Sequence, residues 1–147
     1  MSQLYLTLPS NSSNDIYPNN TSASYTVRLH REILLESGEW EVGLAEIHFP
    51  YNKQLPQTLH ICTNIIEHQL VGTGLQPLLR IIGLKGRKEG EIISKVYERP
   101  HYKPASGGVL RAVDIKICKD MKSVNVTGGP VTAVLHLRRV KEPYFHI

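Results

Sequence analysis

Cysteine is scarce in this chain of 147 residues, which has only Cys62 and Cys118. The two lie far apart in the sequence and match none of the spacings of a zinc site. We interpret them as a buried, reduced pair, as expected of an intracellular protein. The first residues fit this interpretation, because they lack the basic start and the long apolar segment of a secretory signal.

Long hydrophobic runs are missing too. No run approaches the roughly 20 apolar residues that cross a bilayer as a helix, so we expect no membrane span. Convincing helical segments are also absent. Residues 31–37 are too few for a stable helix and are followed by Gly38, so we interpret them as a connection.

The groupings of residues that are typical of enzymes do not occur. The seven histidines include no pair four residues apart and no cluster with cysteine, and we place all of them on the solvent-facing sides of strands. The glycine pairs at 72–74 and 107–108 lack the strand–turn–helix setting of a phosphate-binding loop. We therefore expect no catalytic, cofactor-binding or metal-binding residues, and no small-molecule substrate.

Acidic residues are few in the second half of the chain. Residues 1–70 carry three bases and seven acids, whereas residues 71–147 carry fourteen bases and six acids. Such asymmetry can steer a domain towards an acidic partner or a nucleic acid, or it can be an uneven soluble surface. The bases are scattered over several expected strands instead of forming a stripe with aromatic residues, so nucleic-acid binding is not favoured.

What the sequence does have is alternation. From Trp40 to Leu44 apolar residues alternate with others, and from Ala45 the alternation continues one residue out of phase. A shift of one residue would turn the apolar side chains outward unless the strand bulges there. We predict a bulged, central strand over residues 38–50, with Trp40 as a core anchor, closed by Pro50, which cannot donate to a ladder.

Shorter alternating or apolar segments recur along the rest of the chain. They fall at residues 4–8, 25–29, 59–66, 77–83, 92–96, 113–118 and 131–138, and we expect residues 77–83 to be a buried strand and Lys85–Gly90 to be the tip of a hairpin. Eight to ten strands without a helix predict one all-β domain over residues 1–147, an antiparallel β-sandwich. About eight main strands favour a single jelly roll over an immunoglobulin-like fold. A loop at residues 10–22 and a tail at residues 141–147 flank the strands.

Several segments of the chain resemble one family of proteins. They are Leu6–Asn20, Gly38–Ile47, Glu67–Gly72, Pro77–Ile81, Arg99–Pro104 and Val134–Arg139. Taken in order they span nearly the whole chain, and they resemble the penton-type minor capsid protein of Maverick/Polinton elements and adintoviruses. The turn at residues 119–129 is more basic here than the Asp-rich turn common in that family, so a contact made there would differ.

The resemblance implies a vertical jelly roll that assembles as a homopentamer at the vertices of an icosahedral shell, beside a double jelly-roll major capsid protein. It also implies a virion protein that assembles inside the host cell, in the nucleus. A head-to-tail ring needs two different, complementary surfaces on each subunit. The uneven charge would supply them if the two halves of the chain lay on opposite flanks. The candidate subunit contacts lie in the loop and the tail, and they are Ile16, Tyr17, Tyr144, Phe145 and Ile147.

Two alternatives stay open at this point. The tail can fold back onto its own sandwich instead of reaching a neighbour. The whole protein can also belong to a different class, either a host-domesticated copy or a cytokine- or chaperone-like β-sandwich that binds a partner without catalysis. The missing signal sequence argues against a secreted ligand, and the lack of a long acidic tract argues against a histone chaperone.

Overall fold

The alternating segments form β-strands. The computed structural model describes residues 2–35 and 39–140, and every regular element in those ranges is a strand. The strands are β1 (Gln3–Pro9), β2 (Ser24–Leu35), β3 (Trp40–Pro50), β4 (Thr58–Thr63), β5 (Gln69–Val71), β6 (Gly74–Gln76), β7 (Leu78–Gly83), β8 (Ile92–Val96), β9 (Lys103–Pro104), β10 (Gly108–Lys119), β11 (Lys122–Ser123) and β12 (Thr132–Arg139). The described part of the chain therefore holds no helix with the length and hydropathy to cross a membrane.

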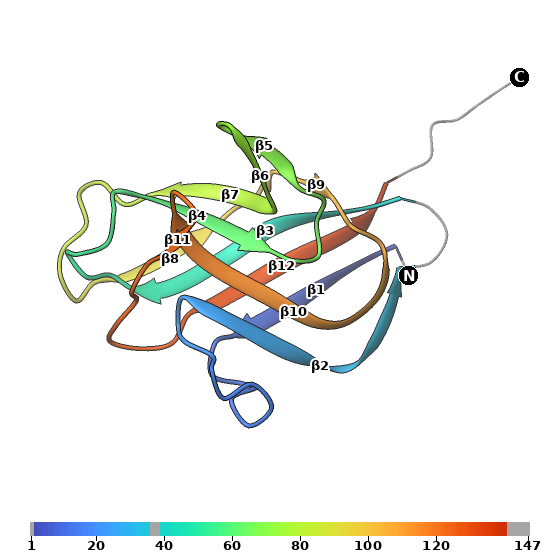
Figure 1. Cartoon of the computed structure of the whole chain (residues 1–147), viewed down its shortest axis with the longest axis horizontal. Helices are drawn as coiled ribbons and strands as arrows, with labels where there is room; N and C mark the ends of the chain where they lie inside the picture. The colour runs from blue at the N-terminus through green and yellow to red at the C-terminus, as the bar shows by residue number, and fades with distance from the viewer. Residues whose placement is uncertain (1, 36–38, 141–147) are drawn as a thin grey trace, which may run out of the picture.

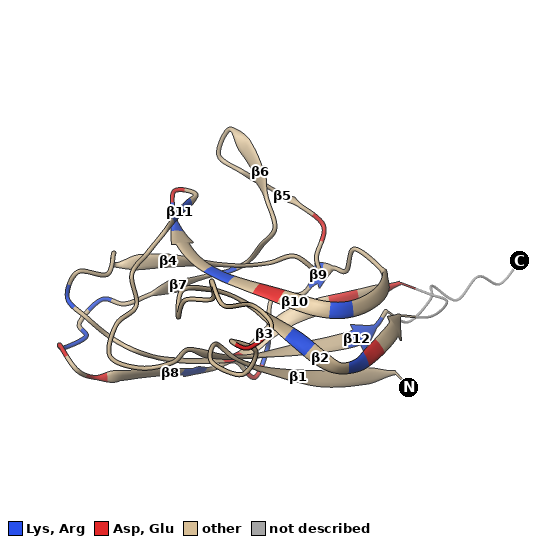
Figure 2. Cartoon of the chain, turned by 60° about the horizontal axis from the view of Figure 1, so that its bottom comes forward, with Lys and Arg blue, Asp and Glu red and all other residues tan. Residues whose placement is uncertain are grey.

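Two antiparallel sheets pack face to face. Sheet A has the order β1-β12-β3-β8, and the short β9 pairs with β3. Sheet B has the order β2-β10-β4-β7, and the short β11 pairs with the end of β10. Figure 2 shows β8, β3, β12 and β1 in one layer, below β4, β7 and β10 in the other. The hairpin of β5 and β6 projects from this sandwich (Figure 1). The predicted all-β, antiparallel architecture is confirmed.

The core fills the space between the sheets because alternate side chains of every long strand point inward. Burial of these apolar side chains is the main favourable contribution to folding. The largest fully buried side chains come from both sheets and, for Ile66, from the segment after β4, and they are Leu8, Leu44, Ile47, Phe49, Leu59, Ile61, Ile66, Leu79, Ile82, Ile93, Ile115 and Ile117.

The phase slip in β3 is a bulge, as predicted. Its neighbour β12 pairs Leu135 with Leu44 and Val134 with Glu46, so Ala45 has no opposite residue. The Ala45 carbonyl instead accepts a hydrogen bond from the Tyr97 amide at 2.8 Å. β3 lies between β12 and β8, and the Trp40 side chain is buried in the core. The prediction of a bulged, central strand with Trp40 inside is confirmed.

Three local predictions are wrong. The connection expected at residues 31–37 is strand up to Leu35, because β2 resumes its pairing with β10 after an irregularity opposite Arg111. Lys85–Gly90 is not a hairpin tip, because β7 pairs with β4 in sheet B and β8 pairs with β3 in sheet A, so the turn crosses between the sheets. The segment 77–83 is only half buried, because its strand is the edge of sheet B and Ile81 is 53% exposed.

Candidate functional site

The loop at residues 10–22 is held against the sandwich at its start. The Ser10 amide donates to the Val131 carbonyl at 2.8 Å, and the Ser10 hydroxyl accepts from the Val131 amide at 3.0 Å. Both Ser10 and Ser13 are buried, although the loop is mostly polar. Short polar side chains of this kind readily bond to nearby backbone. The loop is therefore a fixed part of the domain and not a free arm.

The same loop occupies the outer edge of β2. The Asn20 side chain accepts from the Thr26 amide at 3.0 Å and donates to the Thr26 carbonyl at 2.9 Å, as a neighbouring strand would. The Ser13 hydroxyl accepts from the Arg28 amide at 3.0 Å. Thr21 exchanges hydrogen bonds with the backbone of Ser24 in the same way. Side chains of the loop thus cover this edge of sheet B along residues 24–28.

Two of the candidate contacts, Ile16 and Tyr17, sit at the tip of this loop. The Ile16 side chain is 55% exposed, and Tyr17 is half-buried. Together with Asp114 and Lys116 of β10 they line a groove of about 310 Å³. The groove offers an apolar wall from the loop and a charged wall from the sheet. The other candidate contacts, Tyr144, Phe145 and Ile147, lie outside the described residues.

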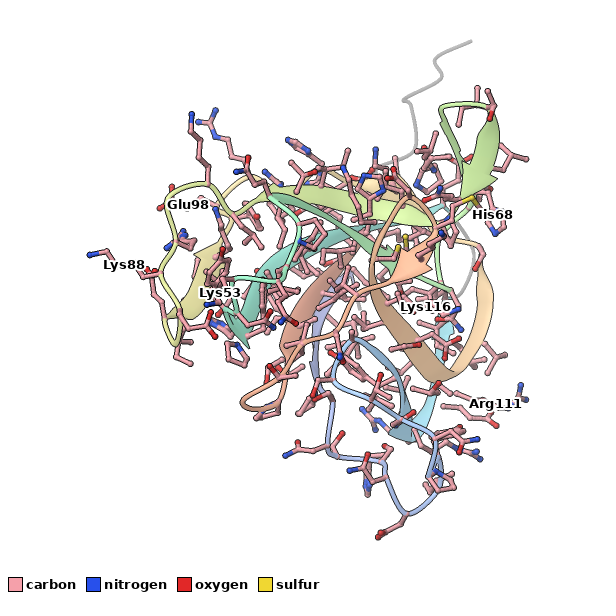
Figure 3. All side chains as sticks on the ribbon, turned by 60° about the vertical axis from the view of Figure 1, so that its left-hand side comes forward. Lys53, His68, Lys88, Glu98, Arg111 and Lys116 are labelled. Atoms are coloured by element: carbon pink, nitrogen blue, oxygen red, sulfur yellow. The ribbon has the colours of Figure 1, made fainter. Side chains whose placement is uncertain are left out.

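The two halves of the chain do not lie on opposite flanks. In sheet A the second-half strands β12 and β8 lie on either side of β3, and in sheet B the second-half strand β10 lies between β2 and β4. The two halves are therefore mixed along the molecule. In Figure 3, Lys53 of the first half lies at the same end as Lys88 of the second half, whereas Lys116 and Arg111, also of the second half, lie away from that end. The uneven charge would supply complementary surfaces only if the two halves of the chain lay on opposite flanks, and they do not.

The outer face of sheet A carries an aromatic and polar cluster. The Tyr102 hydroxyl lies 2.8 Å from His136 Nδ1, and Tyr5 stacks on the His136 ring with centroids 4.4 Å apart. The Arg138 guanidinium lies 3.6 Å above the Tyr102 ring. His136 is buried by these neighbours, contrary to the prediction that every histidine faces solvent, and His60 is buried as well. Burial, followed by the nearby Arg138 charge, lowers the pKa of His136.

This cluster depends on a glycine in β3. A Cβ built on Gly43 would lie 2.6 Å from the Pro100 Cβ and 3.1 Å from the Tyr102 ring. The segment that follows β8 therefore lies directly on the backbone of β3, which only a residue without a side chain permits.

A larger groove lies where β3 begins. It has a volume of about 500 Å³ and is lined by the apolar residues Leu35, Trp40 and Val140 and by the acidic residues Glu39 and Glu67. Glu41 also lines it, but its carboxylate bonds to Arg138 Nε at 2.5 Å. This mixture suits a protein segment better than a small charged substrate.

The cysteines lie side by side on the outer side of sheet B. Their Sγ atoms are 3.9 Å apart, both thiols are free, and both are buried, as predicted. Burial raises the pKa of Cys62 to about 12, so its thiol stays protonated and is a poor nucleophile. Among the described residues, no three His, Cys, Asp or Glu side chains lie close enough together to hold a metal ion.

No protein-family model matches the chain, and no curated protein matches it.

Proposed function

We propose that the chain is a structural virion protein, a penton-type minor capsid protein whose single jelly roll forms the pentameric vertices of an icosahedral shell. The observation that carries this proposal is the way in which the long strands are paired. The resemblance of the sequence to the penton-type family is consistent with it.

The eight strands of five or more residues pair in a nested order. In chain order the first pairs with the eighth (β1 with β12), the second with the seventh (β2 with β10), the third with the sixth (β3 with β8) and the fourth with the fifth (β4 with β7). These four antiparallel pairs fall alternately in sheet A and sheet B. One long ribbon of strands, folded in the middle and wound around a core, has this order. The jelly roll, a fold common among viral capsid proteins, is wound in this way, and the pairing order therefore supports the proposed fold.

Three of the segments that resemble the penton-type family meet at one place. Gly43 from the segment Gly38–Ile47 is covered by Pro100 from the segment Arg99–Pro104. Arg138, from the segment Val134–Arg139, stacks on Tyr102. These segments are far apart in the sequence and close together on sheet A, so the resemblance concerns residues that position one another. It supports a common fold first, and the penton role through that fold.

The proposed partners are further copies of this chain, in a homopentamer, and a double jelly-roll major capsid protein around it. The groove at Ile16 and Tyr17 and the groove at Trp40 are surfaces with apolar walls that suit protein partners. The proposed location is the virion, with assembly in the host nucleus.

The test is a mass measurement of the purified full-length chain by light scattering, from low to high salt. The expected result is a discrete species of five times the 16.6 kDa monomer mass. The same sample should show rings with five-fold symmetry by electron microscopy. A monomer under all salt conditions would contradict the proposal and would favour a β-sandwich binding module that acts as a single copy.

A further inference from the structure

The two sheets differ in how their edges end. An edge strand presents unpaired backbone groups, and proteins cover or interrupt such edges unless another chain pairs with them. In sheet B the edge strand β2 is covered by Ser13, Asn20 and Thr21, which bond to its outward backbone groups. Another strand therefore cannot pair with residues 24–28 of this edge.

The β1 edge of sheet A is uncovered. The Ser10 amide bonds to the Val131 carbonyl, and the Arg139 amide bonds to the Ser2 carbonyl. Hydrogen-bonded pairs alternate along an antiparallel ladder. The backbone amides and carbonyls of the even-numbered residues of β1 therefore bond to β12, and those of the odd-numbered residues point away from it. Within the described ranges, no residue bonds to the outward backbone groups of Gln3, Tyr5 and Thr7. The ladder with β12 is also continuous over seven residues, without a bulge or a charged side chain to interrupt the edge.

The opposite edge of sheet A, β8, is uncovered in the same way. The Tyr51 amide bonds to the Glu91 carbonyl and the Tyr97 amide bonds to the Ala45 carbonyl. The backbone amides and carbonyls of the odd-numbered residues of β8 therefore face β3, whereas those of Ile92, Ser94 and Val96 point away from the sheet. No described residue bonds to these groups.

Exposed apolar side chains accompany both open edges. On sheet A the exposed large apolar side chains among the described residues are Tyr5 at 62%, Ile92 at 61% and Val96 at 65%. All three belong to the edge strands β1 and β8, and all three point to the outer face of the sheet, because their neighbours Leu6 and Ile93 point inward. A strand added at either edge would bring such side chains into cross-strand contact.

We propose that β1 of one copy pairs with β8 of the next, so that sheet A continues from subunit to subunit. This inference rests on the proposed function, because it names the contact that builds the ring. Sheet A is the better suited to continue, since its edge strands β1 and β8 are open while residues 24–28 of the β2 edge of sheet B are covered. The partner is a second copy of this chain.

The strand directions fit a head-to-tail contact. Three antiparallel steps separate β1 from β8, so the two run in opposite directions. A copy rotated about an axis parallel to the strands therefore presents a β1 that is antiparallel to the first copy's β8. Repetition of the same rotation closes a ring. If the middle outward residues of the two edges, Tyr5 and Ser94, lie opposite each other, Thr7 lies opposite Ile92 and Gln3 lies opposite Val96.

Proline substitutions test each edge separately. Thr7→Pro removes an outward amide from β1, and Val96→Pro removes one from β8, while neither amide takes part in a bond within its own sheet. Proline is tolerated in an edge strand when its nitrogen faces outward. The matched controls are Thr7→Val and Val96→Thr, which keep the amide. Thermal unfolding of each variant shows that the fold is retained, and light scattering measures the mass.

Each proline alone is expected to weaken assembly about tenfold or more, through one lost hydrogen bond and a carbonyl left unpaired, while the controls assemble as the wild type does. The two proline variants together retain one good pair of edges, since the Val96→Pro copy offers an intact β1 and the Thr7→Pro copy an intact β8. Their mixture should form a one-to-one dimer of twice the 16.6 kDa monomer mass and nothing larger.

Three results would overturn the inference. If both proline variants assemble to the same mass as the wild type, the edges do not pair, and the proposed pentamer is unaffected. Loss of assembly with only one of the two prolines, and no dimer in the mixture, would indicate a contact between two like edges. A wild-type chain that is monomeric at every salt concentration would contradict the proposed function, and the edge pairing with it.

Discussion

Substitution of Gly43 by alanine should destabilise the protein although it adds only one methyl group. The new Cβ would lie 2.6 Å from the Pro100 Cβ, a distance that real Cβ contacts do not reach. Pro100 cannot move easily, because the ring is rigid and the segment is fixed at both sides by the Tyr97–Ala45 and Ala105–Trp40 backbone hydrogen bonds, both 2.8 Å. Such overpacking costs about 1–3 kcal/mol. At about 2–4 °C per kcal/mol, the melting temperature should fall by roughly 4–8 °C for a cost of 2 kcal/mol.

Urea unfolding followed by tryptophan fluorescence measures this cost, because Trp40 is the only tryptophan and is buried. Gly83→Ala is the matched control. Gly83 also lies in a strand, but a Cβ added there meets nothing within 4 Å, so its free energy of unfolding should stay the same or rise slightly. Pro100→Gly removes the atom that clashes. In that background, Gly43→Ala should cost at least about 1 kcal/mol less than in the wild type.

The reasoning would be refuted if Gly43→Ala and Gly83→Ala had the same free energy of unfolding within about 0.5 kcal/mol, the usual range of neutral surface substitutions. It would also be refuted if Pro100→Gly did not reduce the cost of Gly43→Ala. Either result would mean that the segment after β8 can lift from β3 without loss.

Three further predictions concern other parts of the sandwich. Trp40→Ala should lower the free energy of unfolding by about 3–5 kcal/mol, as measured by calorimetry, because it empties a core position; normal stability with lost assembly would mean that Trp40 is a contact residue instead. Asn20→Ala should cost about 1–2 kcal/mol in urea unfolding, because it leaves the amide and carbonyl of Thr26 without their partner, whereas the exposed Asn19→Ala should cost almost nothing. Because the folded state lowers the pKa of His136, its contribution to stability is complete above the unfolded value of about 6.5 and is lost as the pH falls below that value. His136→Gln should flatten this part of the stability curve between pH 7.5 and pH 5, and an unchanged curve would show that His136 is not its cause.

The sequence by itself determined those features that depend on the local geometry of an extended chain. Side chains alternate with a period of two in any strand, so the alternation was enough to locate β1, β3, β10 and β12 and to distinguish their inward faces. The phase slip at Ala45 was enough to predict the bulge, because a strand with one buried face cannot accommodate it otherwise.

Only the tertiary structure decided which strands are neighbours and which side chains are covered. The turn at Lys85–Gly90 has the same composition whether it joins two paired strands or crosses between sheets, so the hairpin prediction was wrong. His136 is buried because Tyr5 and Tyr102, which are far away in the sequence, lie on it. The covered edge of β2 and the open edges of β1 and β8 follow from the same cause. An exposed backbone amide is identical in every strand, and whether it has a partner depends on chain segments that only the folded structure brings together.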